Sequence, residues 1–302
     1  MQEVYRANDG LLGRTVALKA PKNRSAAKRF QRSAVVSARV NHANVAKTLD
    51  YVEEADRAYL IEEFIEGKDL GRVLKENFGQ FDPLLACRVF HRLAKGLAAS
   101  HHAGVVHRDI KPSNVMAVGG ENVRDVKITD FGIAKLAEDE LAEAIEGGDD
   151  SITASQTAIG ALPYMAPEMI NSMKDAGKPA DVWSLGALCF ELIAGLKPFG
   201  SGLKAVPAIQ AAKLPPLPRN VTSNLQFKAS AEELYALVKD CIVAEPGRRP
   251  TADQLVSRCE VLCYPTAQRE FGHVSSIKNP YFGFITAENG SDVFVHVDCS
   301  RP

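Results

Sequence analysis

Apolar residues recur every three or four positions over long stretches of this chain, which is the pattern of amphipathic and buried α-helices. One helix is predicted to begin at Asp82 and Pro83, a capping residue followed by proline at the first helical position, and to end at Gly104. A shorter helix is predicted over roughly residues 25–40, and a more apolar one through residues 182–192. The core positions predicted for the shorter helix are Phe30, Ala34 and Ala38.

Other stretches mark further helix starts and strands. Two later helices are predicted to begin at capping boxes, in which a hydroxyl residue is followed three positions later by Glu or Gln. These pairs are Ser230 with Glu233, and Thr251 with Gln254. Residues 14–19, Arg-Thr-Val-Ala-Leu-Lys, alternate as in a β-strand. The chain therefore mixes helices with strands.

Composition narrows the class of protein. A length of 302 residues suits about two domains, and 46% apolar with 24% charged residues is ordinary for a globular chain. The formal charge of −1 gives no overall attraction to nucleic acid or anionic membranes. The six cysteines form no paired Cys-x-x-Cys motifs for zinc, which favours reduced thiols and a cytoplasmic location. No apolar run is long enough to span a bilayer, and nothing resembles a signal peptide.

The densest candidate chemistry lies in residues 107–114, His-Arg-Asp-Ile-Lys-Pro-Ser-Asn. Phosphoryl transfer needs an aligned hydroxyl, neutralised phosphate oxygens and a metal held between them. Asp109 can accept a hydroxyl proton, Lys111 can reach a moving phosphoryl group, and Asn114 offers a neutral oxygen to a metal. Asp130, in Asp-Phe-Gly, supplies a charged metal ligand. These residues are the predicted catalytic and metal-binding set.

The order of four motifs resembles the eukaryotic-type Ser/Thr protein kinases. They are HRDIKPSN at 107–114, DFG at 130–132, YMAPE at 164–168 and DVWSLG at 181–186. The resemblance implies an α+β, bilobal fold that uses ATP and Mg²⁺ to phosphorylate protein hydroxyls. The implied kinase domain covers residues 1–264, with a small β-rich lobe over 1–64 and a hinge with a large helical lobe over 65–264.

The same resemblance assigns the nucleotide-binding residues. Lys19 would reach the α- and β-phosphates, and Ala17 would leave room for adenine. Val4 lies at the exit of the family's glycine-rich loop, and Glu63 to Ile65 form the hinge whose backbone binds the adenine edge. By this alignment the chain begins where the glycine-rich loop would end, without the family's first strand and loop glycines. Either the true start lies upstream of Met1 or this lobe is clipped.

Four positions depart from the family pattern. Gln2 stands at the place of the last loop glycine, and Ala161 replaces a threonine that hydrogen-bonds near the catalytic aspartate. Ser33 occupies the place of the helix glutamate that pairs with the strand lysine. Glu62 occupies the gatekeeper position, which is normally apolar. We hypothesise that Glu62 replaces the missing helix carboxylate and holds Lys19, although a solvent-facing glutamate is the alternative.

Further residues have roles implied by the family. His107 is expected to be structural, and Arg249 is expected to form an ion pair with Glu168. Arg108 either forms a loop ion pair or, as we favour, receives a phosphate on the activation segment. That segment is rich in acidic residues, and its candidate phosphorylation sites are Ser151, Thr153, Ser155 and Thr157.

The chain changes character after a predicted linker at residues 265–270. Residues 271–302 resemble the first three strands of a cold-shock domain, a partial OB-fold β-meander, with Asn289-Gly290 as a hairpin turn. By strand alternation one face carries Phe282, Phe284, Phe294 and His296, where bases of single-stranded RNA or DNA could stack. The alternative is an aromatic face that packs on something else.

Three functions remain open on the sequence. The first is an ATP- and Mg²⁺-dependent Ser/Thr protein kinase. The second is a pseudokinase, a binding module whose lobe lacks the glycine loop, the helix glutamate and the activation-segment threonine. The third is a single-stranded nucleic-acid-binding protein that carries a kinase scaffold, and it depends on residues 271–302 alone.

Overall fold

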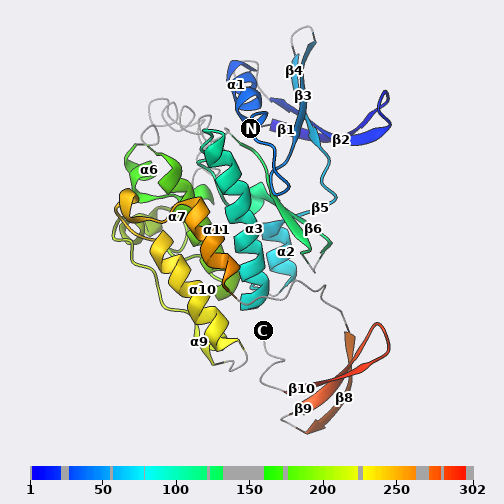
Figure 1. The fold of residues 1–302 in the computed structure, drawn as a ribbon, viewed down its shortest axis with the longest axis vertical. Helices are drawn as coiled ribbons and strands as arrows, with labels where there is room; N and C mark the ends of the chain where they lie inside the picture. Colours follow the sequence, from blue (N-terminus) through cyan, green and yellow to red (C-terminus); the bar gives the residue numbers. More distant parts are fainter. Residues whose placement is uncertain are drawn as a thin grey trace.

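The structure is a computed structural model in which the chain folds into a small lobe, a large helical lobe and a separate three-stranded sheet (Figure 1). The described residues are 2–21, 27–54, 57–77, 79–120, 123–131, 160–172, 176–223, 227–262, 272–279 and 282–296. The candidate phosphorylation sites between 151 and 157, the linker at 265–270 and Gly132 lie outside them. No helix of the described residues is long and apolar enough to cross a membrane.

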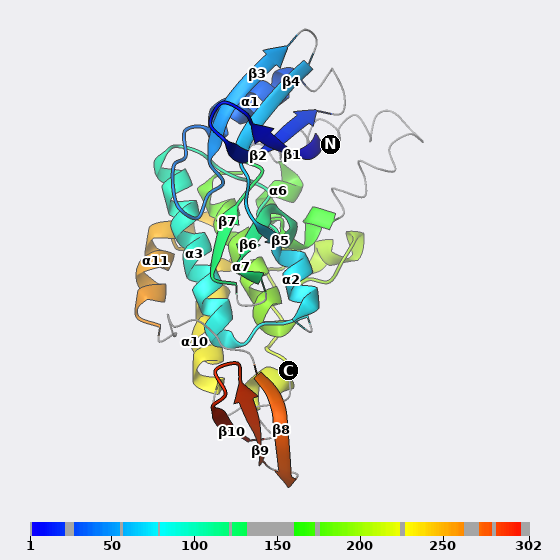
Figure 2. The ribbon, with the colours of Figure 1, turned by 90° about the vertical axis from the view of Figure 1, so that its right-hand side faces the viewer.

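The small lobe is an antiparallel sheet with one helix packed on it (Figure 2). Its strands lie in the order β1-β2-β4-β3, and the bounds of the elements are β1 Gln2–Asp9, β2 Arg14–Pro21, α1 Ala27–Ser37, β3 Thr48–Glu54 and β4 Arg57–Glu63. Phe30 and Ala34 of α1 are buried against Ala58 and Leu60 of the sheet. This packing fixes which side of α1 faces the sheet.

Two details of the small-lobe prediction change. The predicted helix over 25–40 is shorter, because it ends at Ser37. Phe30 and Ala34 are buried as predicted, but Ala38 lies beyond the last helical residue and is exposed, so its prediction as a core position is wrong.

Among the described residues, the core of the large lobe is built on five helices of 7 to 20 residues. Their bounds are α2 Leu70–Glu76, α3 Pro83–His102, α7 Lys178–Ala194, α10 Lys228–Cys241 and α11 Ala252–Glu260. The predicted cap is confirmed, since the Asp82 carboxylate accepts the backbone N–H groups of Leu84 and Leu85. Helix α7 is buried on nearly all sides, as its apolar sequence predicts, and lies in the middle of this core.

One of the two capping boxes is confirmed. Thr251 and Gln254 cap each other's backbone at the start of α11. The pair of Ser230 with Glu233 is wrong as a helix start, because α10 already begins at Lys228 and Ser230 lies inside its first turn. The shorter elements of the lobe are η5 Leu162–Tyr164, α6 Pro167–Asn171, η7 Leu203–Ala205, α8 Val206–Gln210, α9 Arg219–Thr222 and η8 Pro246–Arg248.

A small antiparallel sheet under the small lobe carries the predicted catalytic loop. Its strands lie in the order β5-β6-β7, with bounds β5 Gly67–Asp69, β6 Val115–Val118 and β7 Asp125–Ile128. The 3-10 helix η2, Pro112–Asn114, leads directly into β6. The loop after α1 joins this sheet, because Ala46 N–H donates to the Ile128 carbonyl and Ile128 N–H donates to the Asn44 carbonyl. The two lobes therefore meet next to Asp130.

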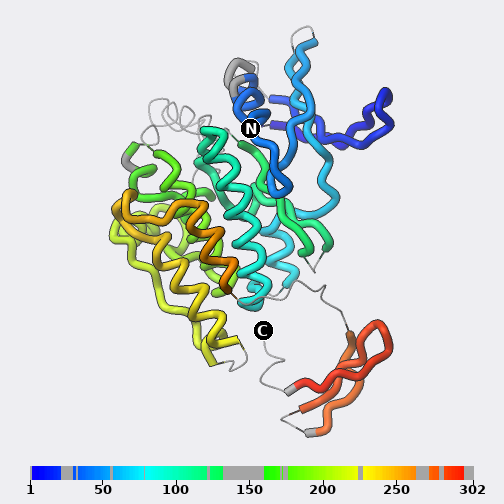
Figure 3. The backbone as a smooth tube through the Cα atoms, viewed as in Figure 1, coloured from blue at the N-terminus to red at the C-terminus, as the bar shows by residue number. Residues whose placement is uncertain are grey.

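The third sheet forms the red end of the tube in Figure 3. It is an antiparallel meander of β8 Gly272–Asn279, β9 Phe282–Ala287 and β10 Asp292–His296, with β9 in the middle. The predicted hairpin turn is confirmed, since Gly290 has a φ of 82° that favours glycine, and Ala287 N–H donates to the Ser291 carbonyl.

Candidate active site

The predicted catalytic loop brings Lys111 and Asn114 into contact with the Asp109 carboxylate. Lys111 Nζ lies 2.8 Å from Asp109 Oδ2, and Asn114 Nδ2 donates to the same oxygen over 2.8 Å. Asn114 Nδ2 also donates to the backbone carbonyl of Asp109. The side chains of Asp109 and Lys111 are only 17% and 14% exposed, so a cation and an amide hold the carboxylate in a partly dry environment.

Helix α7 anchors this loop through the side chain of Asp181. Asp181, which is fully buried, accepts the backbone N–H groups of His107 and Arg108 over 2.8 and 2.6 Å, and His101 Nε2 lies 2.9 Å from it. Arg108 has a φ of 65°, a costly conformation for a residue other than glycine. The hydrogen bonds to Asp181 offset that cost and fix the position of Asp109 next in the chain.

His107 joins the loop to the strand that leads to Asp130. Its side chain is fully buried, its Nε2 lies 2.8 Å from the Thr129 carbonyl, and its Nδ1 accepts the backbone N–H of Asp109. With both ring nitrogens engaged by the backbone, His107 has the structural role that the sequence predicts. Its ring also contacts the ring of Phe131 edge-on, with centroids 4.5 Å apart.

Lys19 lies between two carboxylates. Its Nζ is 2.6 Å from Glu62 Oε2 and 2.8 Å from Asp130 Oδ1, and the Lys19 and Glu62 side chains are 7% and 6% exposed. Lys19 and Glu62 belong to neighbouring strands, because Ala17 of β2 pairs with Glu62 of β4. Side chains at Ala17 and Lys19 share one face of the strand, so the sheet itself brings the pair together.

Two carboxylates sharing one ammonium shift each other's titration. Burial would lower the pKa of Lys19, but the charges of Asp130 and Glu62 outweigh it and hold this pKa above its ordinary value. Burial would raise the pKa of Asp130, but Lys19 and a hydrogen bond from Gln2 hold it below its ordinary value. Burial raises the pKa of Glu62, and Lys19 only partly opposes that effect. Asp130 therefore keeps its charge more readily than Glu62.

Two contacts at the site were not anticipated. Ser33 Oγ donates to the Phe131 carbonyl over 2.5 Å, and both residues are buried. Gln2 Nε2 donates to Asp130 Oδ1 over 2.7 Å. The sequence singles out Ser33 and Gln2 only as departures from a family pattern. Their partners become visible only when the lobes are assembled, since 98 and 128 positions separate the members of each pair.

Comparison with known proteins agrees with this geometry. The family profile described as "Protein kinase domain" matches residues 1–259. The chain belongs to the protein kinase family. The serine/threonine-protein kinase PkaA of Streptomyces coelicolor is 32% identical over 261 residues, which cover 84% of this chain and 44% of that protein.

Other bacterial kinases show similar likeness. The probable serine/threonine-protein kinase PknB of Corynebacterium glutamicum is 30% identical over 271 residues, covering 86% of this chain and 39% of that protein. The serine/threonine-protein kinase PknA of Mycobacterium tuberculosis is 34% identical over 228 residues, covering 72% and 49%. The kinase chain described here thus spans less than half the length of each of these relatives.

The predicted nucleotide residues lie along the strands and hinge of the kinase domain. Val4 pairs with Lys19 across β1 and β2, so the two side chains share the face of the sheet that carries Ala17. Glu63 ends β4, and its backbone N–H donates to the Lys47 carbonyl. Ile65 is half-buried in the segment that follows. Binding of an adenine edge by the backbone of residues 63–65 stays a prediction.

The Glu63 side chain joins the two lobes. Its carboxylate oxygens lie 2.8 and 2.9 Å from Lys127 Nζ, and one of them also accepts the Lys47 backbone N–H over 2.7 Å. Lys127 belongs to β7, three positions before Asp130. A contact between the hinge and the strand that leads to Asp130 was not predicted from the sequence.

The residues assigned to Mg²⁺ fit a metal that binds together with phosphates. Asn114 uses its amide nitrogen toward Asp109, so the amide oxygen is the atom that can face a cation. Asp130 adds a carboxylate of lowered pKa. Within the described ranges no three His, Cys, Asp or Glu side chains form a metal cluster. Mg²⁺ is usually held by one or two carboxylates and substrate phosphates, so two protein ligands suffice.

Two further residues of the predicted site are Ala161, which departs from the family pattern, and Arg108, which was predicted to receive a phosphate. Ala161 is buried and carries no hydroxyl to bond near Asp109 and Lys111. Arg108 donates its Nε to the Ala176 carbonyl over 3.0 Å. The activation-segment residues that Arg108 could meet after phosphorylation lie outside the described residues, so its proposed phosphate-receiving role stays a prediction.

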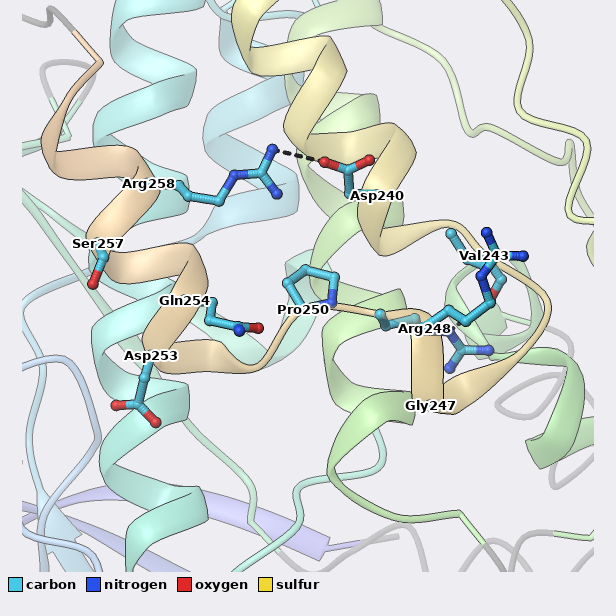
Figure 4. Close-up of a pocket in the computed structure, with 10 residues that line it drawn as sticks. Asp240, Val243, Gly247, Arg248, Pro250, Asp253, Gln254, Ser257 and Arg258 are labelled. Atoms are coloured by element: carbon cyan, nitrogen blue, oxygen red, sulfur yellow. Dashed lines mark hydrogen bonds and ion pairs between the residues drawn. The ribbon is translucent and has the colours of Figure 1, made fainter.

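The predicted ion pair of Arg249 with Glu168 is confirmed. Two nitrogens of Arg249 bind the two carboxylate oxygens over 2.6 and 2.8 Å, and the guanidinium lies 5.0 Å from the centroid of the Trp183 ring. Arg249 also contributes to a pocket beside α10 and α11, across which Arg258 pairs with Asp240 (Figure 4). None of the candidate catalytic residues lines this pocket.

Proposed function

We propose that this chain is an ATP- and Mg²⁺-dependent serine/threonine protein kinase that transfers the γ-phosphoryl group to protein hydroxyls. The observation that carries the proposal is the Asp109 carboxylate, held by Lys111 and Asn114 in the loop that family members use for transfer. The matching family and the named kinases among its relatives support the same reaction. ATP supplies the phosphoryl group, and Mg²⁺ neutralises the charge of its phosphates.

Each residue has a proposed task. Asp109 orients the substrate hydroxyl and accepts its proton, a role that typically contributes about 10²–10⁴-fold. Lys111 lies next to Asp109 and neutralises charge on the moving phosphoryl group. Asn114 and Asp130 hold the metal, and Lys19 binds the α- and β-phosphates.

We also propose that Glu62 performs the task of the missing helix carboxylate. Its oxygen lies 2.6 Å from Lys19 Nζ, and both side chains are buried. A lysine held on one side by Glu62 keeps its ammonium directed into the site when Asp130 binds metal. The alternative of a solvent-facing glutamate does not agree with a side chain that is 6% exposed.

The rival proposal is a pseudokinase. Two departures from the family pattern, Ser33 and Ala161, favour it. The contacts of Asp109 with Lys111 and Asn114 favour the kinase, because a binding module does not need them. Phosphoamino-acid analysis after incubation of the purified chain with Mg-ATP and a generic protein substrate separates the two. The kinase yields phosphoserine or phosphothreonine. Nucleotide binding without any phosphoamino acid would favour the pseudokinase.

A second candidate function rests on the β8 to β10 sheet, which we propose is cold-shock-like. Its register places Phe294 opposite Phe284 and His296 opposite Phe282, so these positions share a face. The Phe282 and Phe294 rings are 5.4 Å apart, and Phe294 is 59% exposed. Such a face suits stacking on unpaired bases. Gel-shift titration with single-stranded RNA and DNA tests it, with Phe294→Ser as the variant expected to weaken binding.

A further inference from the structure

Helix α1 contacts the metal-binding segment through Ser33, not through a carboxylate. Ser33 is 6% exposed, and its hydroxyl donates to the Phe131 carbonyl over 2.5 Å. The side of α1 that faces the sheet is fixed by Phe30 and Ala34, which pack against β4. A serine side chain is short, so its hydroxyl can bond only groups that lie next to the helix. The bond therefore links α1 directly to the residue after Asp130.

Phe131 has contacts with both lobes, one through its ring and one through its backbone carbonyl. Its ring is buried against His107 of the catalytic loop, with centroids 4.5 Å apart, while its carbonyl is held by Ser33 of the small lobe. Asp130 has a φ of 63°, a costly conformation for a residue other than glycine, which persists only when its surroundings enforce it. Contacts to Phe131 from both lobes contribute to that enforcement, and Lys19 and Gln2 bind the Asp130 carboxylate itself.

The link of α1 to Phe131 is separate from the link that holds Lys19. Glu62 contributes the carboxylate next to Lys19 from β4, so the pair lies entirely within the sheet. A displacement of α1 would leave Lys19 and Glu62 together but would break the hydrogen bond from Ser33 to Phe131. Ser33 thus reaches the metal-binding segment from α1, whereas Lys19 of β2 contacts both Glu62 and Asp130.

We propose that Ser33 is a positioning residue that helps to hold Asp130 in its metal-binding orientation, so that α1 acts on the metal site through Phe131 and does not supply a carboxylate to Lys19. The inference rests on the proposed kinase function and deepens it. The expected consequence is specific: loss of the Ser33 hydroxyl weakens the response to Mg²⁺ and leaves metal-free nucleotide binding unchanged.

The test measures the affinity of the whole chain for a fluorescent ATP analogue with and without Mg²⁺. Outer-sphere partners of metal ligands typically contribute about 10–100-fold to metal affinity. We expect Ser33→Ala to reduce the Mg²⁺ enhancement of nucleotide affinity by about tenfold, with metal-free affinity within twofold of wild type. Ser33→Thr, which keeps the hydroxyl, restores the enhancement. Ser33→Cys keeps the size with a weaker donor and serves if the alanine variant does not fold.

Ser37→Ala is the matched control. Ser37 is a buried serine on the same helix, 4% exposed, and its hydroxyl bonds Thr48 and the Ala34 carbonyl, away from the site. We expect this variant to lower thermal stability without changing the Mg²⁺ enhancement. Equal effects of the Ser33 and Ser37 variants, or a wild-type chain whose nucleotide affinity ignores Mg²⁺, would overturn the inference. Mg²⁺-dependent binding without phosphoryl transfer would instead contradict only the proposed function.

Discussion

The Lys19 ammonium and the Glu62 carboxylate lie 2.6 Å apart, and both side chains project from adjacent strands of the small-lobe sheet. A lysine that is held by a neighbouring strand needs no movement of α1 to be in place. We therefore propose that the Glu62 carboxylate, at the gatekeeper position, acts in the nucleotide site by holding Lys19.

The first prediction concerns this pair. Glu62→Gln removes the charge that orients Lys19, so we expect the affinity for nucleotide to fall about tenfold, the equivalent of about 1.4 kcal/mol. Titration with a fluorescent ATP analogue measures it. Glu54→Gln makes the same chemical change at an exposed position of β3 and is expected to leave affinity unchanged. Equal affinities of Glu62→Gln and wild type would contradict the role of Glu62.

A second prediction concerns pH and stability. Burial raises the pKa of Glu62 above its ordinary value of 4.5, although Lys19 opposes the shift and Asp130 and Glu63 add to it. Because the folded state then binds the proton more tightly than the unfolded state, ionisation of Glu62 costs stability as the pH rises from 4.5 through the raised pKa. Lys19 keeps Asp130 as a partner in Glu62→Gln. We therefore expect this variant to have a higher Tm than wild type at neutral pH.

The pH dependence checks the cause of that gain. Below the ordinary pKa of Glu62 both wild type and variant carry a neutral side chain at position 62, so the difference in Tm should disappear. Thermal unfolding followed by circular dichroism between about pH 4 and pH 8 measures the difference. A difference in Tm that does not vary with pH would show that the charge of Glu62 is not its source.

The third prediction separates structure from catalysis in the large lobe. Arg249→Ala leaves the Glu168 carboxylate without its two hydrogen bonds, and we expect a loss of about 3–5 kcal/mol in the free energy of unfolding. Arg248 is exposed next to it, and Arg248→Ala is expected to stay within about 0.5 kcal/mol of wild type. Urea unfolding measures both. A loss in Arg249→Ala no larger than in the control would contradict the structural role.

A fourth prediction concerns Ala161. The family resemblance implies a threonine at this position whose hydroxyl bonds near the catalytic aspartate and lysine, so we expect Ala161→Thr to raise kcat severalfold with little change in the KM for ATP. Because Ala161 is only 6% exposed, the larger threonine side chain must fit among packed neighbours, which affects the stability of the fold. Steady-state kinetics together with Tm therefore check it. A higher KM for ATP with unchanged kcat would contradict a role on the substrate side.

The elements that were predictable are those whose signal is local. Asp82 with Pro83, Thr251 with Gln254, and Asn289 with Gly290 each act within one turn of chain, and the structure has them as predicted. The prediction of a helix start at Ser230 was wrong because a capping box competes with other possible starts. Helix α10 begins at Lys228, two residues before Ser230. Local sequence alone does not decide that competition.

The contacts of the candidate site were likewise predictable where they are local in sequence and unpredictable where they join distant segments. The contacts of Asp109 with Lys111 and Asn114 arise within one short loop, so the motif alone indicates them. The contact of Ser33 with Phe131 depends on how α1 packs over the large lobe, and no local pattern encodes it. The link between Glu63 and Lys127 arises similarly from two distant segments. Glu62 was predictable only because two departures from one pattern suggested a shared cause.

The most direct test of the central claim is the intact mass of the purified chain after incubation with Mg-ATP and a protein substrate. We predict added mass in steps of one phosphate on the chain or its substrate, reduced about 10²–10⁴-fold in rate by Asp109→Asn. A chain that binds Mg-ATP but adds no phosphate, or adds it equally fast without the Asp109 carboxylate, would contradict the assignment of a protein kinase.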